Sequence, residues 1–169
     1  MLESPSSQAE YSEYTTQAVR DRPDVMEEIM HCPKGIHAFG HSHLQWHMEN
    51  CGIFHINPGS CGCSLSASTD ATYTIVELTA DSWLVSEHHV KYDVEVTIDG
   101  LRSSALYEHA EIWCRVIIYQ LREGRDYISF VLRYALETAK KYGYKEASPV
   151  SNEIWHEAAR TFKMIDIYR

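Results

Sequence analysis

Histidine is the residue type in this sequence most able to do chemistry, because neutral imidazole binds Zn, Fe, Mn or Ni. The chain has 10 histidines, and six of them lie between His31 and His55. Gly40, His41, Ser42 and His43 form the densest part of this cluster. Two histidines at i and i+2 inside a strand would point to opposite faces. Just past a strand end, after a glycine, both rings can turn toward one point.

The elements that must position these histidines follow from the hydrophobic pattern. Residues 36–39 read as a short strand that ends at Gly40, and residues 53–56 as a second strand ended by an Asn-Pro-Gly turn. Strand ends in an α/β sheet are where ligand sites form. Residues 73–78 and 83–90 predict a hairpin. Two short helices are expected before the strands, over residues 10–20 and from Pro23 to Ile29.

After Gly100 the hydrophobic period changes from 2 to 3.6. It predicts three amphipathic helices, over residues 106–121, 128–139 and 150–165, broken by Gly124 and by residues 143–149. We therefore expect an α/β region over residues 1–100 and an all-α extension over residues 101–169.

The charge balance excludes one class of function. The chain has 24 acidic and 15 basic residues and a net charge of −9, so stable nucleic-acid binding, which needs clustered Lys and Arg, is not expected. Acidic residues concentrate in residues 1–100.

There is no apolar run of membrane-spanning length and no signal peptide, which predicts a cytoplasmic protein without membrane contact. The five cysteines are expected to be reduced thiols.

Residues 40–62, GHSHLQWHMENCGIFHINPGSCG, resemble the C-terminal signature of calcineurin-like metallophosphoesterases, most closely the small bacterial phosphodiesterase-type branch. The resemblance covers about residues 35–90, and residues 148–162 are similar to a helical extension of some bacterial members. It implies part of a β-sandwich flanked by helices. It also implies that His41 and His43 each bind one ion of a dinuclear Mn, Fe, Zn or Ni pair. The turn at Asn57, Gly59 and Ser60 would pack beside that site.

The other ligand motifs of that family do not occur in this sequence. Asp-x-His, Gly-Asp-x-x-Asp, Gly-Asn-His-Asp and His-Gly are all absent, and two-metal hydrolysis needs more ligands than two imidazoles. The resemblance implies a metal-dependent phosphoesterase that hydrolyses a phosphodiester or nucleotide-type phosphate with metal-activated water. We expect this chain to match only its C-terminal half and to be inactive or weakly active alone. No catalytic residue is assigned within it.

Other candidate residues have plainer interpretations. His47 is a candidate for the edge of a substrate pocket. His37 and His55 read as half-buried strand residues, His88 and His89 as neighbours on opposite faces, and His109 and His156 as surface residues of helices. Cys61 and Cys63 lack the second ligand pair typical of structural zinc sites. The set Arg115, Arg122, Arg125 and Arg133 reads as a solvated face, with contact to an anionic substrate as the alternative.

A second function remains open on the sequence alone. The chain could be a non-catalytic metal-binding or protein-interaction module left by truncation. An apolar sheet edge exposed in such a module would favour homo-oligomers. As part of an enzyme, the chain would bind a phosphorylated small molecule or a nucleotide as substrate.

Overall fold

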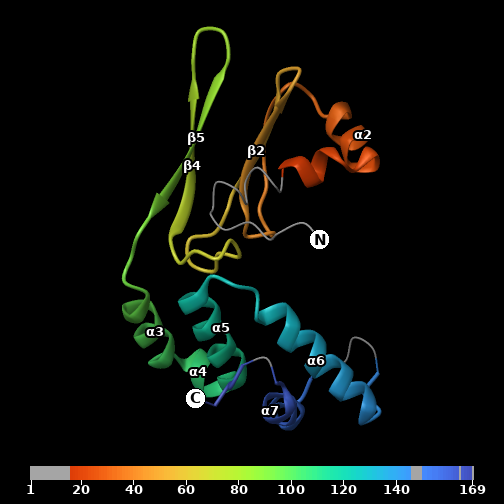
Figure 1. Ribbon diagram of the computed structural model, residues 1–169, viewed down its shortest axis with the longest axis vertical. Coiled ribbons are helices and arrows are strands. Elements are labelled where there is room, and N and C mark those ends of the chain that lie inside the picture. The colour runs from red at the N-terminus through yellow and green to blue at the C-terminus, as the bar shows by residue number, and fades with distance from the viewer. Residues whose placement is uncertain (1–15, 146–149, 164, 169) are drawn as a thin grey trace. The chain divides into compact units, whose positions relative to one another are not determined.

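The computed structural model describes residues 16–145, 150–163 and 165–168, and it has a mixed α/β architecture with two small sheets (Figure 1). The chain divides into two compact units. The strand unit comprises residues 1–92 and 123–125, and the helical unit comprises residues 93–122 and 126–169. Of the helix expected over residues 10–20, only residues 16–20 are described, and these are helical.

The strand unit contains a three-stranded sheet in the order β1-β3-β2. Strands β1 (Gly35–Ala38) and β3 (Ile53–Pro58) are parallel, and β2 (Gln45–Asn50) is antiparallel to β3. The sequence predicted β1 and β3 but not β2, although Trp46 and Met48 alternate with the exposed His47 and Glu49 as in a half-buried strand. Every residue of β3 except Pro58 is buried, as expected for the central strand.

Helix α2 (Pro23–His31) packs on the apolar face of this sheet. It begins at a proline, whose fixed φ suits the first helical turn. Ile29 of the helix packs with Trp46 and Met48 of β2 in one buried cluster. The sheet is therefore anchored on one face by a helix, and its β1 edge is unpaired within the described residues.

The predicted hairpin is confirmed as strands β4 (Ala71–Leu78) and β5 (Trp83–Val90), which pair antiparallel along their whole length. The connecting turn is closed by the Thr79 amide, which donates to the Ser82 carbonyl at 2.8 Å. The Thr79 hydroxyl donates to the same carbonyl at 2.7 Å. Turn chemistry and strand alternation pointed to one hairpin, which is why the sequence identified it.

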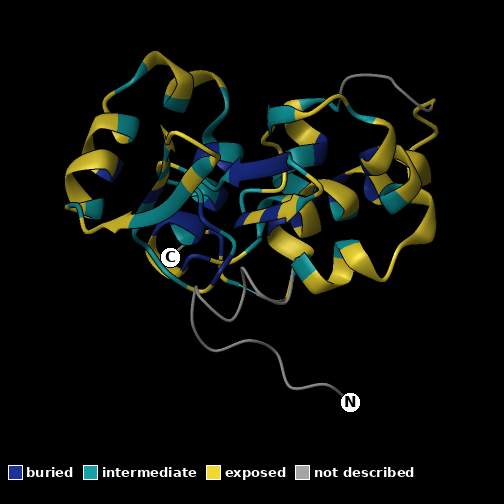
Figure 2. Ribbon diagram, turned by 90° about the horizontal axis from the view of Figure 1, so that it is seen from above, coloured by how far each residue is buried: buried dark blue, intermediate teal, exposed yellow. Residues whose placement is uncertain are grey.

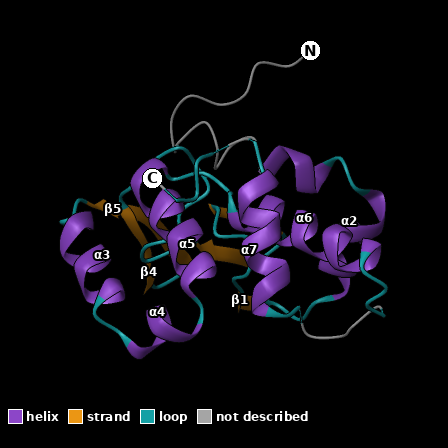
Figure 3. Cartoon of the chain, turned by 90° about the horizontal axis from the view of Figure 1, so that it is seen from below, coloured by secondary structure: helices purple, strands orange, loops and turns teal. Residues whose placement is uncertain are grey.

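The helical unit holds five helices among the described residues: α3 (Val94–Arg102), α4 (Ala105–His109), α5 (Glu111–Glu123), α6 (Ile128–Lys141) and α7 (Asn152–Thr161) (Figure 3). The sequence missed α3, although Asp93 caps it by accepting from the Glu95 and Val96 amides. Residue 100, the expected region boundary, lies inside this helix. The single helix predicted over 106–121 is two helices, interrupted at Ala110 (φ −139°, ψ 49°).

The core of the helical unit is apolar and comes from α5, α6, α7 and the C-terminal residues. Its buried members are Ile112, Val116, Val131, Ala159 and Ile167. Along α5, α6 and α7, buried and exposed residues alternate as the 3.6 period requires (Figure 2). None of the helices in the described ranges is long and apolar enough to cross a membrane.

Candidate functional site

The Gly-His-Ser-His segment forms a tight corner directly after β1, and its backbone is strained at both histidines. His41 has φ of 77° and His43 has φ of 57°, in the left-handed region that costs an ordinary L-residue about 1–2 kcal/mol. Strain of this kind persists only where surrounding contacts hold it, and it concentrates at functional sites. The sequence predicted the corner from Gly40, but the positive φ angles fall on the histidines themselves.

The Asn57 side chain holds this corner in place. It is fully buried at the end of β3, and its amide nitrogen donates to the Ser42 hydroxyl at 2.9 Å and to the Gly40 carbonyl at 3.3 Å. Its carbonyl oxygen accepts from the Gly59 amide at 3.0 Å. One side chain thus ties the histidine corner to the Asn-Pro-Gly-Ser turn.

The imidazole of His43 is oriented by a backbone contact. Its Nδ1 lies 2.8 Å from the Cys63 carbonyl oxygen, which can only accept, so Nδ1 carries the hydrogen. In the neutral ring the lone pair is then on Nε2. Metal-binding histidines commonly donate their other ring nitrogen to a carbonyl or carboxylate, which fixes the tautomer and the ring orientation.

Ser60 and Gly59 support the carbonyl that orients His43. The Ser60 hydroxyl accepts from the Cys63 amide at 3.0 Å, and the Ser60 amide donates to the Thr72 hydroxyl at 2.8 Å. Gly59 has φ of +85°, and a Cβ there would lie 2.1 Å from Thr72 Oγ1. The turn must therefore have glycine at this position to bring β4 against the corner.

His47 lies on β2, apart from these hydrogen bonds. Its Nδ1 is 2.7 Å from a carboxylate oxygen of Glu87 on β5. The contact links the three-stranded sheet to the hairpin within the strand unit. Its role at a pocket edge stays a prediction.

His55 is more deeply buried than the half-buried position predicted for it, with 6% of its surface exposed. Its ring stacks on His37 at a centroid distance of 5.2 Å, and His37 Nε2 donates to the Pro33 carbonyl. Within the described residues His55 Nε2 has no hydrogen-bond partner. Burial, with a smaller contribution from His37, lowers the pKa of His55 below its ordinary value, so the ring is neutral at pH 7.

Within the described residues, the cysteines and the hairpin histidines do not form a metal-binding group. Burial raises the pKa of the Cys63 thiol, which disfavours the thiolate that a metal would need. His88 stacks on Tyr73, whereas its neighbour His89 pairs with Thr72. In the described part of the chain, no three His, Cys, Asp or Glu side chains converge as a metal-binding group.

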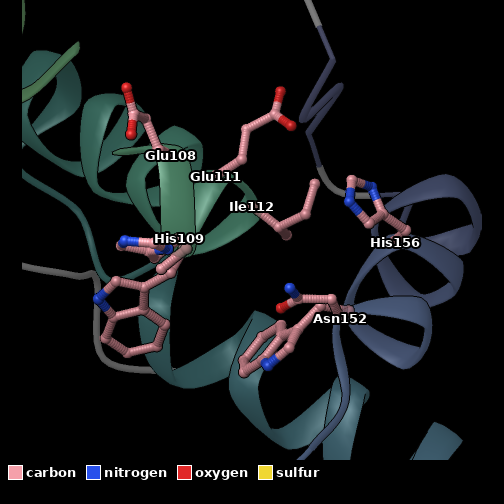
Figure 4. Close-up of a pocket in the computed structure, with 9 residues that line it drawn as sticks. Glu108, His109, Glu111, Ile112, Asn152 and His156 are labelled. Carbon is pink, nitrogen blue, oxygen red and sulfur yellow. The ribbon is translucent and has the colours of Figure 1, made fainter. Parts of the chain in front are cut away.

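A separate pocket of about 110 Å³ lies within the helical unit, and it contains the two histidines predicted to be plain surface residues (Figure 4). His109 ends α4 and His156 lies on α7; both line the pocket, as do Ile112 and Asn152. His156 is half-buried and is also in contact with Tyr168, whose hydroxyl is 2.9 Å from its Nδ1. Sequence spacing could not reveal this pocket, because its two walls, residues 108–113 and residues 152–156, are far apart along the chain.

Comparisons of this chain with protein-family models, with curated proteins and with solved structures found no match.

Proposed function

We propose that this chain provides the histidine corner of a calcineurin-like metallophosphoesterase, with His41 and His43 as ligands of a dinuclear divalent metal centre. The proposal rests on one observation above the others. The Asn57 side chain and the Cys63 carbonyl hold the His-Ser-His corner and fix the ring of His43 with Nε2 available. A corner of ordinary surface residues would not need two positive φ angles to be maintained in this way.

The donor set fits part of such a centre. Two neutral imidazoles suit Mn, Fe, Zn or Ni, but they supply no negative charge and too few ligands for two ions. When bound, the metal pair would supply an activated water and electrostatic stabilisation of a phosphoryl group. The remaining ligands, including a bridging carboxylate, would come from chain not present in this sequence. The three-stranded sheet and the hairpin would then be parts of the β-sandwich.

The substrate class that this proposal implies is a phosphodiester or a nucleotide-type phosphate. This chain's own residues would bind and orient: His43 through its fixed tautomer, and Asn57 and Ser60 by holding the corner against the turn. No proton-transferring residue is assigned in this chain.

Metal binding to point variants tests the proposal. Zn²⁺ titration calorimetry on the purified chain should show binding that is lost in His41→Ala and in His43→Ala. His89→Ala is the matched control, because His89 is exposed on β5. Turnover of a chromogenic phosphodiester with Mn²⁺ should be weak or absent for the chain alone. Equal Zn²⁺ binding by all four proteins would contradict the ligand assignment.

An interaction module is the second candidate, favoured by the hairpin surface. Tyr73, Ile75, Leu84 and Val90 lie on one face of β4 and β5 by their register, and each has at least 41% of its surface exposed. Exposed apolar patches mark interaction surfaces. A Leu84→Ser variant that changes a measured dimer into a monomer in light scattering would favour this candidate.

A further inference from the structure

The helical unit contains three arginines that border one hollow of about 210 Å³. Arg102 ends α3, whereas Arg115 and Arg122 lie on α5, seven residues apart and thus on the same face of the helix. Tyr107 and Tyr119 also line it. Among the described residues, none of its lining side chains is a carboxylate.

Carboxylates that do not line the hollow hold two of these guanidinium groups in place. Arg122 donates through Nε and Nη2 to both oxygens of Glu95, at 2.8 and 2.7 Å. Arg115 donates through Nε to Glu111 at 2.8 Å and through Nη1 to the Ile167 carbonyl at 3.5 Å. A guanidinium has five N–H donors, so each group keeps a nitrogen for a further acceptor. The hydrogen bond from Arg122 lowers the pKa of the Glu95 carboxyl, so this pair stays charged.

Arg102 is the least engaged of the three. Its Nη1 lies 3.6 Å from the Asp99 carboxylate, beyond hydrogen-bond distance, and 46% of its side chain is exposed. It is therefore the guanidinium with the most donors available to a ligand. Arginine binds phosphate oxygens with paired N–H donors, which makes phosphate the anion best matched to such a set.

The net charge of the chain restricts the size of the ligand that the hollow could bind. The chain carries a net charge of −9, which repels a long polyanion such as a nucleic acid, and that repulsion acts over many phosphates. A compact anion touches only the local arginines. We infer that this hollow binds a small phosphate-bearing molecule, at a site in the helical unit that is distinct from the histidine corner and does not depend on a metal.

Pyrophosphate titration calorimetry in metal-stripped buffer tests the site on the full chain. Arg102→Gln should weaken pyrophosphate binding about fivefold, the loss of one half-exposed charged contact. Arg102→Lys keeps the charge without the paired donors, so its affinity for pyrophosphate should lie between those of the parent chain and of Arg102→Gln. Glu95→Gln should act in the opposite direction and strengthen binding about threefold, because it releases Arg122.

Arg133→Gln is the matched control, since Arg133 lies on α6 over the Phe130 ring and does not line the hollow. Circular dichroism of each variant checks that the fold is kept. Absence of pyrophosphate binding at millimolar concentration would overturn the inference. So would equal weakening by Arg102→Gln and Arg133→Gln, which would indicate net charge alone. Tighter binding of a short oligonucleotide than of pyrophosphate would overturn the choice of a small ligand.

Discussion

The two units of the molecule are stabilised by different means. In the strand unit, buried polar side chains such as Asn57 tie loops to strand ends. In the helical unit, an apolar core joins the helices, and charged pairs such as Glu95 with Arg122 lie outside it. The strand unit has 13 acidic and 5 basic residues, and the helical unit has 11 and 10. Loop geometry held by buried polar side chains is therefore concentrated in the strand unit, where we place the metal site.

Asn57→Ala is expected to have the largest effect on stability. It removes three hydrogen bonds and leaves buried polar groups of the corner and the turn without partners, so the free energy of unfolding should fall by about 3 kcal/mol. Urea denaturation measures the change. Asn152→Ala, at an exposed position of α7, is the control from the helical unit and should cost less than about 1 kcal/mol. Equal losses in the two variants would contradict the difference in how the two units are stabilised.

His55→Phe tests the buried histidine through its pH dependence. Because burial lowers the pKa of His55 in the folded state, the unfolded chain binds more protons below its ordinary pKa of about 6.5. Folding stability therefore falls as the pH drops below about 6.5 and continues to fall toward the folded pKa. Phenylalanine cannot titrate, so the variant should lose less stability between about pH 7 and pH 5.

Denaturation at a series of pH values measures how the free energy of unfolding of each variant changes with pH. His89→Phe, at an exposed position of β5, is the matched control for the introduction of a phenylalanine. A His55→Phe variant as acid-sensitive as the parent would show that His55 stays solvated.

Gly100→Ala is expected to have the smallest effect and the opposite sign. Gly100 lies inside α3, and a Cβ there would meet no atom within 4 Å. Alanine should stabilise the helical unit by about 0.7 kcal/mol, because glycine loses more backbone entropy in a helix. Thermal unfolding checks the sign. A lower midpoint for Gly100→Ala would contradict the helix that the structure assigns to residues 94–102.

The sequence predicted the elements in which several local signals agree. It missed elements marked by one weak signal, such as α3 with its Asp93 cap. The β4–β5 hairpin combined alternation with turn residues, and both are present in the structure. Strand β2 was missed because its alternation rests on only two apolar residues, Trp46 and Met48, which is too short a pattern to mark a strand by itself. The break at Ala110 leaves no mark in composition, so the 3.6 period runs on across two helices.

The candidate site was predictable in its residues but not in its contacts. The spacing of His41 and His43 after Gly40 indicated a corner, and Asn57 indicated a turn. Their connection through the Asn57 amide joins residues 15 and 17 positions apart, which no local pattern encodes. The carbonyl that orients His43 is the backbone carbonyl of Cys63. Every residue has a backbone carbonyl, so the sequence does not indicate which one makes this contact.

The most direct test of the histidine corner is the tautomer of His43 and its response to metal. Long-range proton–nitrogen NMR spectra of the ¹⁵N-labelled chain can distinguish the two ring nitrogens, with His43→Ala used for assignment. We predict that neutral His43 carries its hydrogen on Nδ1 and that added Zn²⁺ shifts its Nε2 resonance while the Nδ1 hydrogen remains. A hydrogen on Nε2, or an Nε2 resonance unmoved by Zn²⁺, would contradict a corner arranged for metal binding.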